Sequence, residues 1–294
     1  MTSMTINYIV DSSSFDSKWW ALSARIIDAC VQLMLYGIYV VLFVLAIYTL
    51  SSRKSTGKKL LLGYTWIMAI FGTVQLVLCL VELWIGARCV EVDVTGNFTS
   101  QPELAKLGPL SWSLNTAQEM IFAGNNLVTD TLLLYRCFVI WGSAWRPMVF
   151  PGVLMACTFV AGCVNNLVGV PAAMFRLPYI FAALTNLVLV AFIGGRIWCI
   201  RQDARLVAGD ELRKQYDTVI AMILESGAVY LVVSLLLAVF QSGMAFSILQ
   251  SIAAHMVNIV PTLIIVRVGL GHNIQGTGKT SPVKAARNTR AAPR

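Results

Sequence analysis

Charged residues are scarce in this chain. Asp, Glu, Lys and Arg together make up 12% of the 294 residues, whereas hydrophobic residues make up 57%. Soluble domains carry about 25% charged residues, so this composition excludes an ordinary soluble domain. The mean hydropathy of +0.74 instead indicates a chain that lies largely within a membrane.

Histidine is rarer still, and its scarcity limits the possible chemistry. The two histidines are His255 and His272, so a three-histidine zinc site cannot form, and the seven cysteines show no metal-ligand spacing. No Lys lies between Phe246 and Val268, which excludes a retinal Schiff base in the last apolar segment. The P-loop, Gly-x-Ser-x-Gly and His-Glu-x-x-His motifs are also missing. We therefore expect no catalytic residue, metal or cofactor, and no enzymatic activity.

Long apolar runs are what the sequence has in abundance. Each of seven segments contains about the 20 predominantly apolar residues that a helix needs to cross a bilayer. The runs are unbroken, whereas the strands of a membrane barrel alternate in polarity over about ten residues. The predicted fold class is all-α, a polytopic seven-transmembrane-helix bundle, with spans at about 28–50, 60–86, 116–141, 148–170, 178–200, 217–241 and 247–268.

Basic residues are concentrated in alternate connections between these spans. Most of the 22 Lys and Arg residues lie at the ends of spans one, three, five and seven and in the segments that follow them. Because cytoplasmic loops carry the excess of positive charge, the N-terminus is predicted outside and the C-terminus in the cytoplasm. The predicted parts are an extracellular segment over 1–27, a transmembrane domain over 28–268 and a disordered basic cytoplasmic tail over 269–294. The net charge of +8 follows from this asymmetry, so the expected partner is the lipid bilayer and not nucleic acid.

One glycosylation signal agrees with this orientation. Asn97 begins the only Asn-x-Ser/Thr sequence of the chain. It lies within 87–115, which is the longest of the predicted external loops. We therefore predict Asn97 as a glycosylation site.

Polar residues in spans three and seven follow helical spacing. In span three, one polar stripe runs from Glu119 to Asp130, and a second stripe about 100° away includes Asn125 and Thr129. A helix that is polar on two faces should lie at the centre of the bundle. In span seven, Pro261 should weaken the helix and free a backbone carbonyl.

Several of these polar groups come out near the middle of the membrane, where such groups are costly and often functional. The predicted ligand-binding residues are Asn126, Asp130, Glu225, His255 and Asn258. The alternative is that these groups hydrogen-bond between helices and hold the bundle together. We favour the structural role for the asparagines and a functional role for Asp130 and Glu225, because a charge is a costly way to join helices.

Two stretches carry a resemblance to a known family. Gly124–Pro151 reads GNNLVTDTLLLYRCFVIWGSAWRPMVFP, and Ile259–Gly271 reads IVPTLIIVRVGLG. Together with the layout of spans and the basic first loop, they resemble an uncharacterised family of seven-transmembrane-helix membrane proteins from basidiomycete fungi. The resemblance implies a fungal protein of the plasma membrane or the secretory pathway. It carries over no ligand and no catalytic residue.

These observations favour a receptor-like protein. A small external ligand would meet the five predicted residues inside the bundle, and the cytoplasmic loops, above all Arg196–Lys214, would contact a signalling partner. An alternative is a transporter or lipid-handling protein that uses Asp130 or Glu225 as a proton-linked carboxylate. A second alternative is a membrane scaffold without a small ligand. The sequence leaves all three open.

Overall fold

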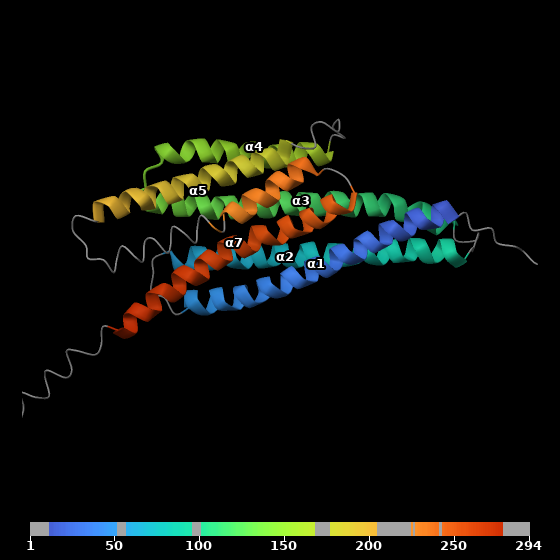
Figure 1. The fold of residues 1–294 in the computed structure, drawn as a ribbon, viewed down its shortest axis with the longest axis horizontal. Helices are drawn as coiled ribbons and strands as arrows, with labels where there is room; N and C mark the ends of the chain where they lie inside the picture. Colours follow the sequence, from blue (N-terminus) through green and yellow to red (C-terminus); the bar gives the residue numbers. More distant parts are fainter. Residues whose placement is uncertain are drawn as a thin grey trace, which may run out of the picture.

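The computed structural model describes residues 12–51, 57–95, 101–167, 177–204, 225, 227–240 and 243–278, and every regular element among them is helical (Figure 1). A short apolar helix, Gly227–Val239, lies between α5 and α7 in the chain. The other bounds are α1 Ser12–Ser51, α2 Lys58–Thr95, α3 Gln101–Ile140, η2 Arg146–Met148, α4 Val149–Leu167, α5 Leu177–Ala204 and α7 Gly243–Gly278.

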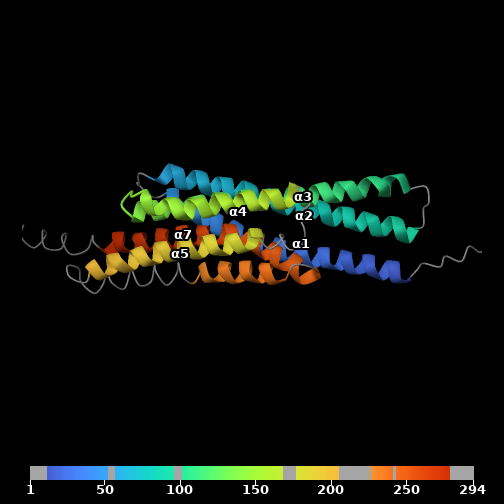
Figure 2. The same ribbon diagram turned by 90° about the horizontal axis from the view of Figure 1, so that it is seen from above.

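The helices lie side by side in one elongated bundle (Figures 1 and 2). α3 contacts α2, α4, α5 and α7, while α1 packs against α2 and α7. The central position of α3, predicted from its two polar faces, is confirmed. α1, α2 and α7 thus lie on one side of α3, and α4 and α5 lie on the other.

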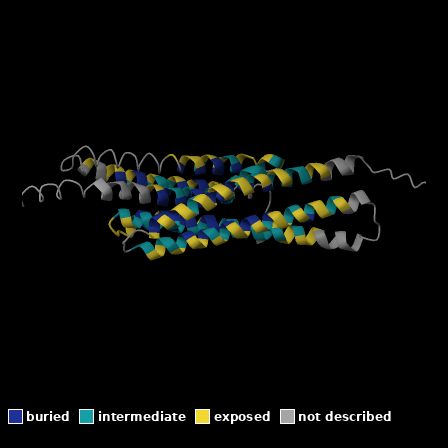
Figure 3. Ribbon diagram, turned by 90° about the horizontal axis from the view of Figure 1, so that it is seen from below, coloured by how far each residue is buried: buried dark blue, intermediate teal, exposed yellow. Residues whose placement is uncertain are grey.

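The bundle is apolar on its outside and contains many polar side chains within. Met34, Val41 and Ile70 are among the large apolar side chains that are exposed, whereas Gln32 and Asn125 are buried. Figure 3 shows exposed and buried residues alternating along the helices, as expected for helices with one outward face. Exposed apolar faces around buried polar groups suit an apolar surrounding medium.

Five of the described helices are long and apolar enough to cross a membrane. They supply the segments Trp19–Ser51, Lys58–Glu91, Arg146–Asn165, Leu177–Cys199 and Gly243–Arg267. α3 is not among them, because its polar side chains lower its hydropathy. The Gly227–Val239 helix is shorter than the roughly 20 residues that a span requires. The chain is a multi-pass integral membrane protein.

The helices extend further than the apolar runs that predicted them. α1 begins at Ser12, inside the predicted external segment 1–27, and α7 continues to Gly278, beyond the predicted last span. α2 and α3 together cover most of 87–115, which was predicted as a loop. The two sets of boundaries differ because hydropathy marks where a helix leaves the apolar layer. A helix itself ends only where its backbone hydrogen bonds end.

Three further predictions concern residues outside the described ranges. They are glycosylation at Asn97, most of the partner-binding segment Arg196–Lys214, and the tail from residue 279 onward. Each of them stays a prediction.

α3 ends in a turn built on Gly142. The Gly142 N–H donates to the carbonyl of Val139 at 3.1 Å, and the Ser143 N–H donates to the carbonyl of Phe138 at 3.0 Å. These two bonds satisfy carbonyls at the end of the helix in the pattern of a Schellman motif. Gly142 has a φ of +68°, in the left-handed region that glycine adopts without a steric penalty. The turn therefore fixes where α3 stops before η2 and α4.

We expect Gly142→Ala to lower the free energy of unfolding by about 1 kcal/mol, because a Cβ is disfavoured at this φ. Thermal unfolding in detergent measures the effect. Gly195→Ala is the matched control, since a Cβ added there inside α5 meets no atom within 4 Å. The control should leave the midpoint unchanged or raise it. Equal midpoints for Gly142→Ala and the wild type would contradict the role of the turn.

Candidate functional site

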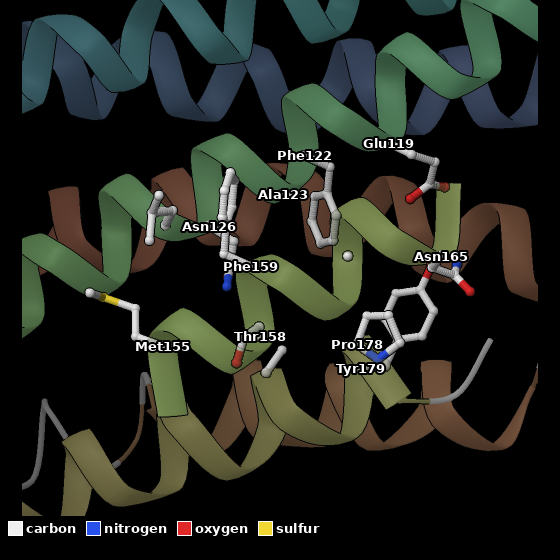
Figure 4. A pocket seen from close by; sticks show the side chains of 13 residues that line it. Glu119, Phe122, Ala123, Asn126, Met155, Thr158, Phe159, Asn165, Pro178 and Tyr179 are labelled. Atoms are coloured by element: carbon white, nitrogen blue, oxygen red, sulfur yellow. The ribbon is translucent and has the colours of Figure 1, made fainter. Parts of the chain in front are cut away.

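A pocket lies between α3, α4 and α5 (Figure 4). Its volume is about 40 Å³, which is room for roughly three water molecules or for part of a small ligand. The residues that line it include Glu119, Phe122 and Asn126 from α3, Thr158 and Asn165 from α4, and Tyr179 from α5. Three helices therefore contribute polar groups to one space inside the bundle.

One end of this pocket is polar. Figure 4 shows Glu119, Asn165 and Tyr179 near one another at this end and Met155 at the other. The Gln250 side chain of α7 donates a hydrogen bond to the Glu119 carboxylate. The Asn165 side-chain oxygen is buried and has no hydrogen-bond partner among the described residues. This end can therefore accept hydrogen bonds from a bound molecule.

Asn126 connects the pocket to the interior of the bundle. Its side chain lines the pocket, and its amide N–H donates to the Asp130 carboxylate at 3.0 Å. The hydroxyl of Tyr230, on the Gly227–Val239 helix, donates to the Asn126 side-chain oxygen at 2.7 Å. All three side chains are buried. A single amide thus joins the pocket wall, a carboxyl group and a neighbouring helix.

The second polar face of α3 meets α7. Pro261 has no N–H, so the carbonyl four residues earlier, at Val257, lacks its usual helical bond. The Thr129 hydroxyl donates to this carbonyl at 3.1 Å. The prediction that Pro261 frees a carbonyl is confirmed, and the structure adds that a side chain of α3 satisfies it.

His255 and Asn258 lie where α7 meets α1 and α2. The His255 ring packs edge-on against Tyr36 with 6.2 Å between centroids, and a Cβ added at Gly72 would lie 3.0 Å from the Asn258 side-chain nitrogen. Both side chains are 0% exposed. Within the described part of the chain, neither ring nitrogen of His255 and neither polar atom of Asn258 has a hydrogen-bond partner. An unpaired buried polar group costs about 1–3 kcal/mol.

Glu225 lies apart from the other predicted residues. Its side chain is 76% exposed, and its carboxylate is 4.0 Å from the Arg267 guanidinium of α7. The five predicted ligand-binding residues therefore occupy three places. Asn126 and Asp130 lie together beside the pocket, the two α7 residues lie where α7 meets α1 and α2, and Glu225 is near Arg267.

Some half-buried polar residues were not selected from the sequence. Asp28 of α1 accepts hydrogen bonds from Ser251 and, at 3.5 Å, from Gln32. Glu82 of α2 lies 3.9 Å from Arg25. Both carboxyls carry the sequence signal that identified Asp130. That signal is an acidic residue within or at the edge of an apolar run. Asp28 was overlooked because it stands at the predicted start of the first span.

The fold and these buried groups define a multi-pass α-helical membrane protein with a small pocket between its helices. No protein-family model, curated protein or solved structure matches the chain. A function must therefore be argued from the residues of the site.

The substitutions Asn126→Leu and Asn258→Leu form a matched pair, because each replaces a buried amide by an apolar side chain of similar size. Asn126→Leu leaves Tyr230 and Asp130 without their shared partner, so we expect a loss of about 1–3 kcal/mol. Asn258→Leu removes an amide that is unpaired among the described residues. We expect it to leave stability unchanged or to raise it.

Thermal unfolding of both variants in the same detergent provides the comparison. A larger loss for Asn258→Leu than for Asn126→Leu would contradict the bonding described here. It would show that the Asn258 amide is hydrogen-bonded in the folded protein.

Proposed function

We propose that this protein is a receptor-like seven-helix membrane protein that senses a small external molecule in the pocket between α3, α4 and α5. The position of Asn126 carries the proposal. Its side chain faces the pocket and is also hydrogen-bonded to Asp130 and Tyr230. A ligand that bonds to Asn126 competes with these two bonds, so occupancy of the pocket is linked to the placement of the Gly227–Val239 helix.

A second contact ties that helix to a wall of the pocket. The Asn186 side chain of α5 donates to the carbonyl of Gly227 at 3.0 Å. A Cβ added at Gly227 would lie 2.4 Å from Val190, so only glycine allows α5 to approach this closely. α3 and α5 both line the pocket and both hold this helix. A ligand that binds one arrangement of these helices more tightly shifts the population toward it.

The proposed topology has seven spans, with α3 and the segment that contains Gly227–Val239 added to the five long apolar helices. It has its N-terminus outside, as the distribution of basic residues favours. The Glu119 end of the pocket then faces outward, and Arg196–Lys214 is available to a cytoplasmic signalling partner. The resemblance to basidiomycete membrane proteins supports a location in the plasma membrane or the secretory pathway.

A proton-linked transporter or lipid-handling protein is the second candidate, and Asp130 favours it. This carboxyl is buried, its hydrogen-bond donor is the neutral Asn126, and none of the described cations forms an ion pair with it. Such a carboxyl can carry a proton across an apolar layer. Glu225 suits this role less, since it is 76% exposed and lies beside Arg267.

Transport predicts a pH-dependent flux in proteoliposomes that is lost in Asp130→Asn. Glu91→Gln, which changes an exposed carboxyl paired with Arg88, is the control and should retain the flux. Wild-type protein without flux across pH and candidate substrates would exclude this function.

The receptor proposal is tested by thermal unfolding with a panel of small amphiphilic compounds. We expect compounds that stabilise the wild type to lose their effect in Ala182→Leu, because the added side chain fills the pocket. Asp130→Asn should reduce the stabilisation while the protein still inserts and folds, because Asp130 positions Asn126. Equal stabilisation of Ala182→Leu and the wild type would contradict the pocket. Failure of Asp130→Asn to fold would assign this carboxyl a structural role.

A further inference from the structure

We propose that the ligand of this pocket is a small protonated amine with an apolar body. This proposal rests on the proposed function, because it concerns the same pocket. It adds the chemical class of the ligand. It follows from three properties of the lining: a carboxylate, an unpaired acceptor and aromatic faces.

Glu119 supplies the charge that such a ligand would pair with. Its carboxylate lines the polar end of the pocket, where its described hydrogen bond comes from the neutral Gln250. None of the described cations forms an ion pair with Glu119. A carboxylate away from bulk water is stabilised by a cation that also donates hydrogen bonds. An ammonium group provides a positive charge and up to three N–H donors.

The remaining polar lining includes an acceptor that a donor on the ligand can satisfy. The Asn165 side-chain oxygen has no partner among the described residues and lies at the same end as Glu119 (Figure 4). The donors deeper in the pocket are already engaged. The Asn126 amide donates to Asp130, and the Thr158 hydroxyl donates to the carbonyl of Leu154 at 2.9 Å. An anionic ligand would therefore meet a like charge at Glu119.

Aromatic side chains surround the space beside these acceptors. Phe122 comes from α3, Phe159 from α4 and Tyr179 from α5. Their faces attract a cation within about 6 Å of the ring centre, and their edges and faces pack against an apolar body. The volume of about 40 Å³ admits only a few heavy atoms, which is enough for the ammonium end of a small ligand but not for its whole body. A carboxylate among aromatic rings therefore suits a small amine better than a sugar, a nucleotide or a carboxylic acid.

Three compounds of similar size separate these chemistries: benzylamine, benzyl alcohol and benzoate. Binding is measured as the rise in unfolding midpoint with concentration, for wild type, Glu119→Gln and Ala182→Leu in the same detergent. We expect benzylamine to bind the wild type most tightly. Its affinity should fall about tenfold or more in Glu119→Gln, whereas that of benzyl alcohol should not change. Glu91→Gln, an exposed carboxyl outside the pocket, should behave as wild type.

The outcomes distinguish this inference from the proposed function. Benzyl alcohol or benzoate could bind more tightly than benzylamine, with Ala182→Leu abolishing that binding. This result would contradict the amine as the ligand class but would support the pocket as the binding site. Benzylamine binding that is unchanged in Glu119→Gln would also contradict the proposal that the ligand is an amine paired with Glu119. If every compound shifts the wild type and Ala182→Leu equally, the pocket itself is wrong, and both proposals fail together.

Discussion

A polar group in the apolar layer of a membrane must find its partner within the protein, and the rest of this bundle depends on how α3 meets that constraint. One face of α3 carries Asn126 and Asp130, which are bonded to each other and to Tyr230. The other face carries Thr129, which donates to the carbonyl of Val257 in α7. Because α3 contacts four of the labelled helices, these bonds fix the rotation of the helix around which the others pack.

Close approach between helices supports the same arrangement. Helices in a membrane gain little from the hydrophobic effect when they associate, so small residues and interhelical hydrogen bonds matter more. Gly227 lets its helix approach Val190 of α5, and a Cβ added at Gly162 of α4 would lie 3.3 Å from Ala123 of α3. The contact between α3 and α4 at Gly162 bounds the pocket on one side. The pocket is therefore defined by the packing of small residues as well as by its polar groups.

Sequence reasoning succeeded where the physics is local. Hydropathy identified the five long apolar helices, helical spacing put α3 at the centre, and the missing N–H of Pro261 predicted a free carbonyl. The pocket could not be predicted from the sequence, because Asn165 and Tyr179 are brought to Glu119 only by the packing of α4 and α5. Glu225 shows a second limit. Its depth can be counted along a helix, but depth does not say whether a side chain faces the bundle, and this one is 76% exposed.

The two polar faces of α3 also suggest how occupancy of the pocket would reach beyond its walls. Asn126 and Thr129 are less than one helical turn apart, so a rotation of α3 that changes the bonds of one also changes those of the other. The Thr129 hydroxyl donates to the carbonyl that Pro261 leaves free. At this point α7 has lost a backbone hydrogen bond, so the helix bends most easily there. His255 and Asn258 lie just before this point, unpaired among the described residues. A shift of α7 that paired them would recover part of the free energy that their burial costs, about 1–3 kcal/mol for each group. A free-energy difference of that size between two arrangements of α7 is enough to change their populations substantially. In the proposed function, α7 would therefore respond to the ligand together with the Gly227–Val239 helix.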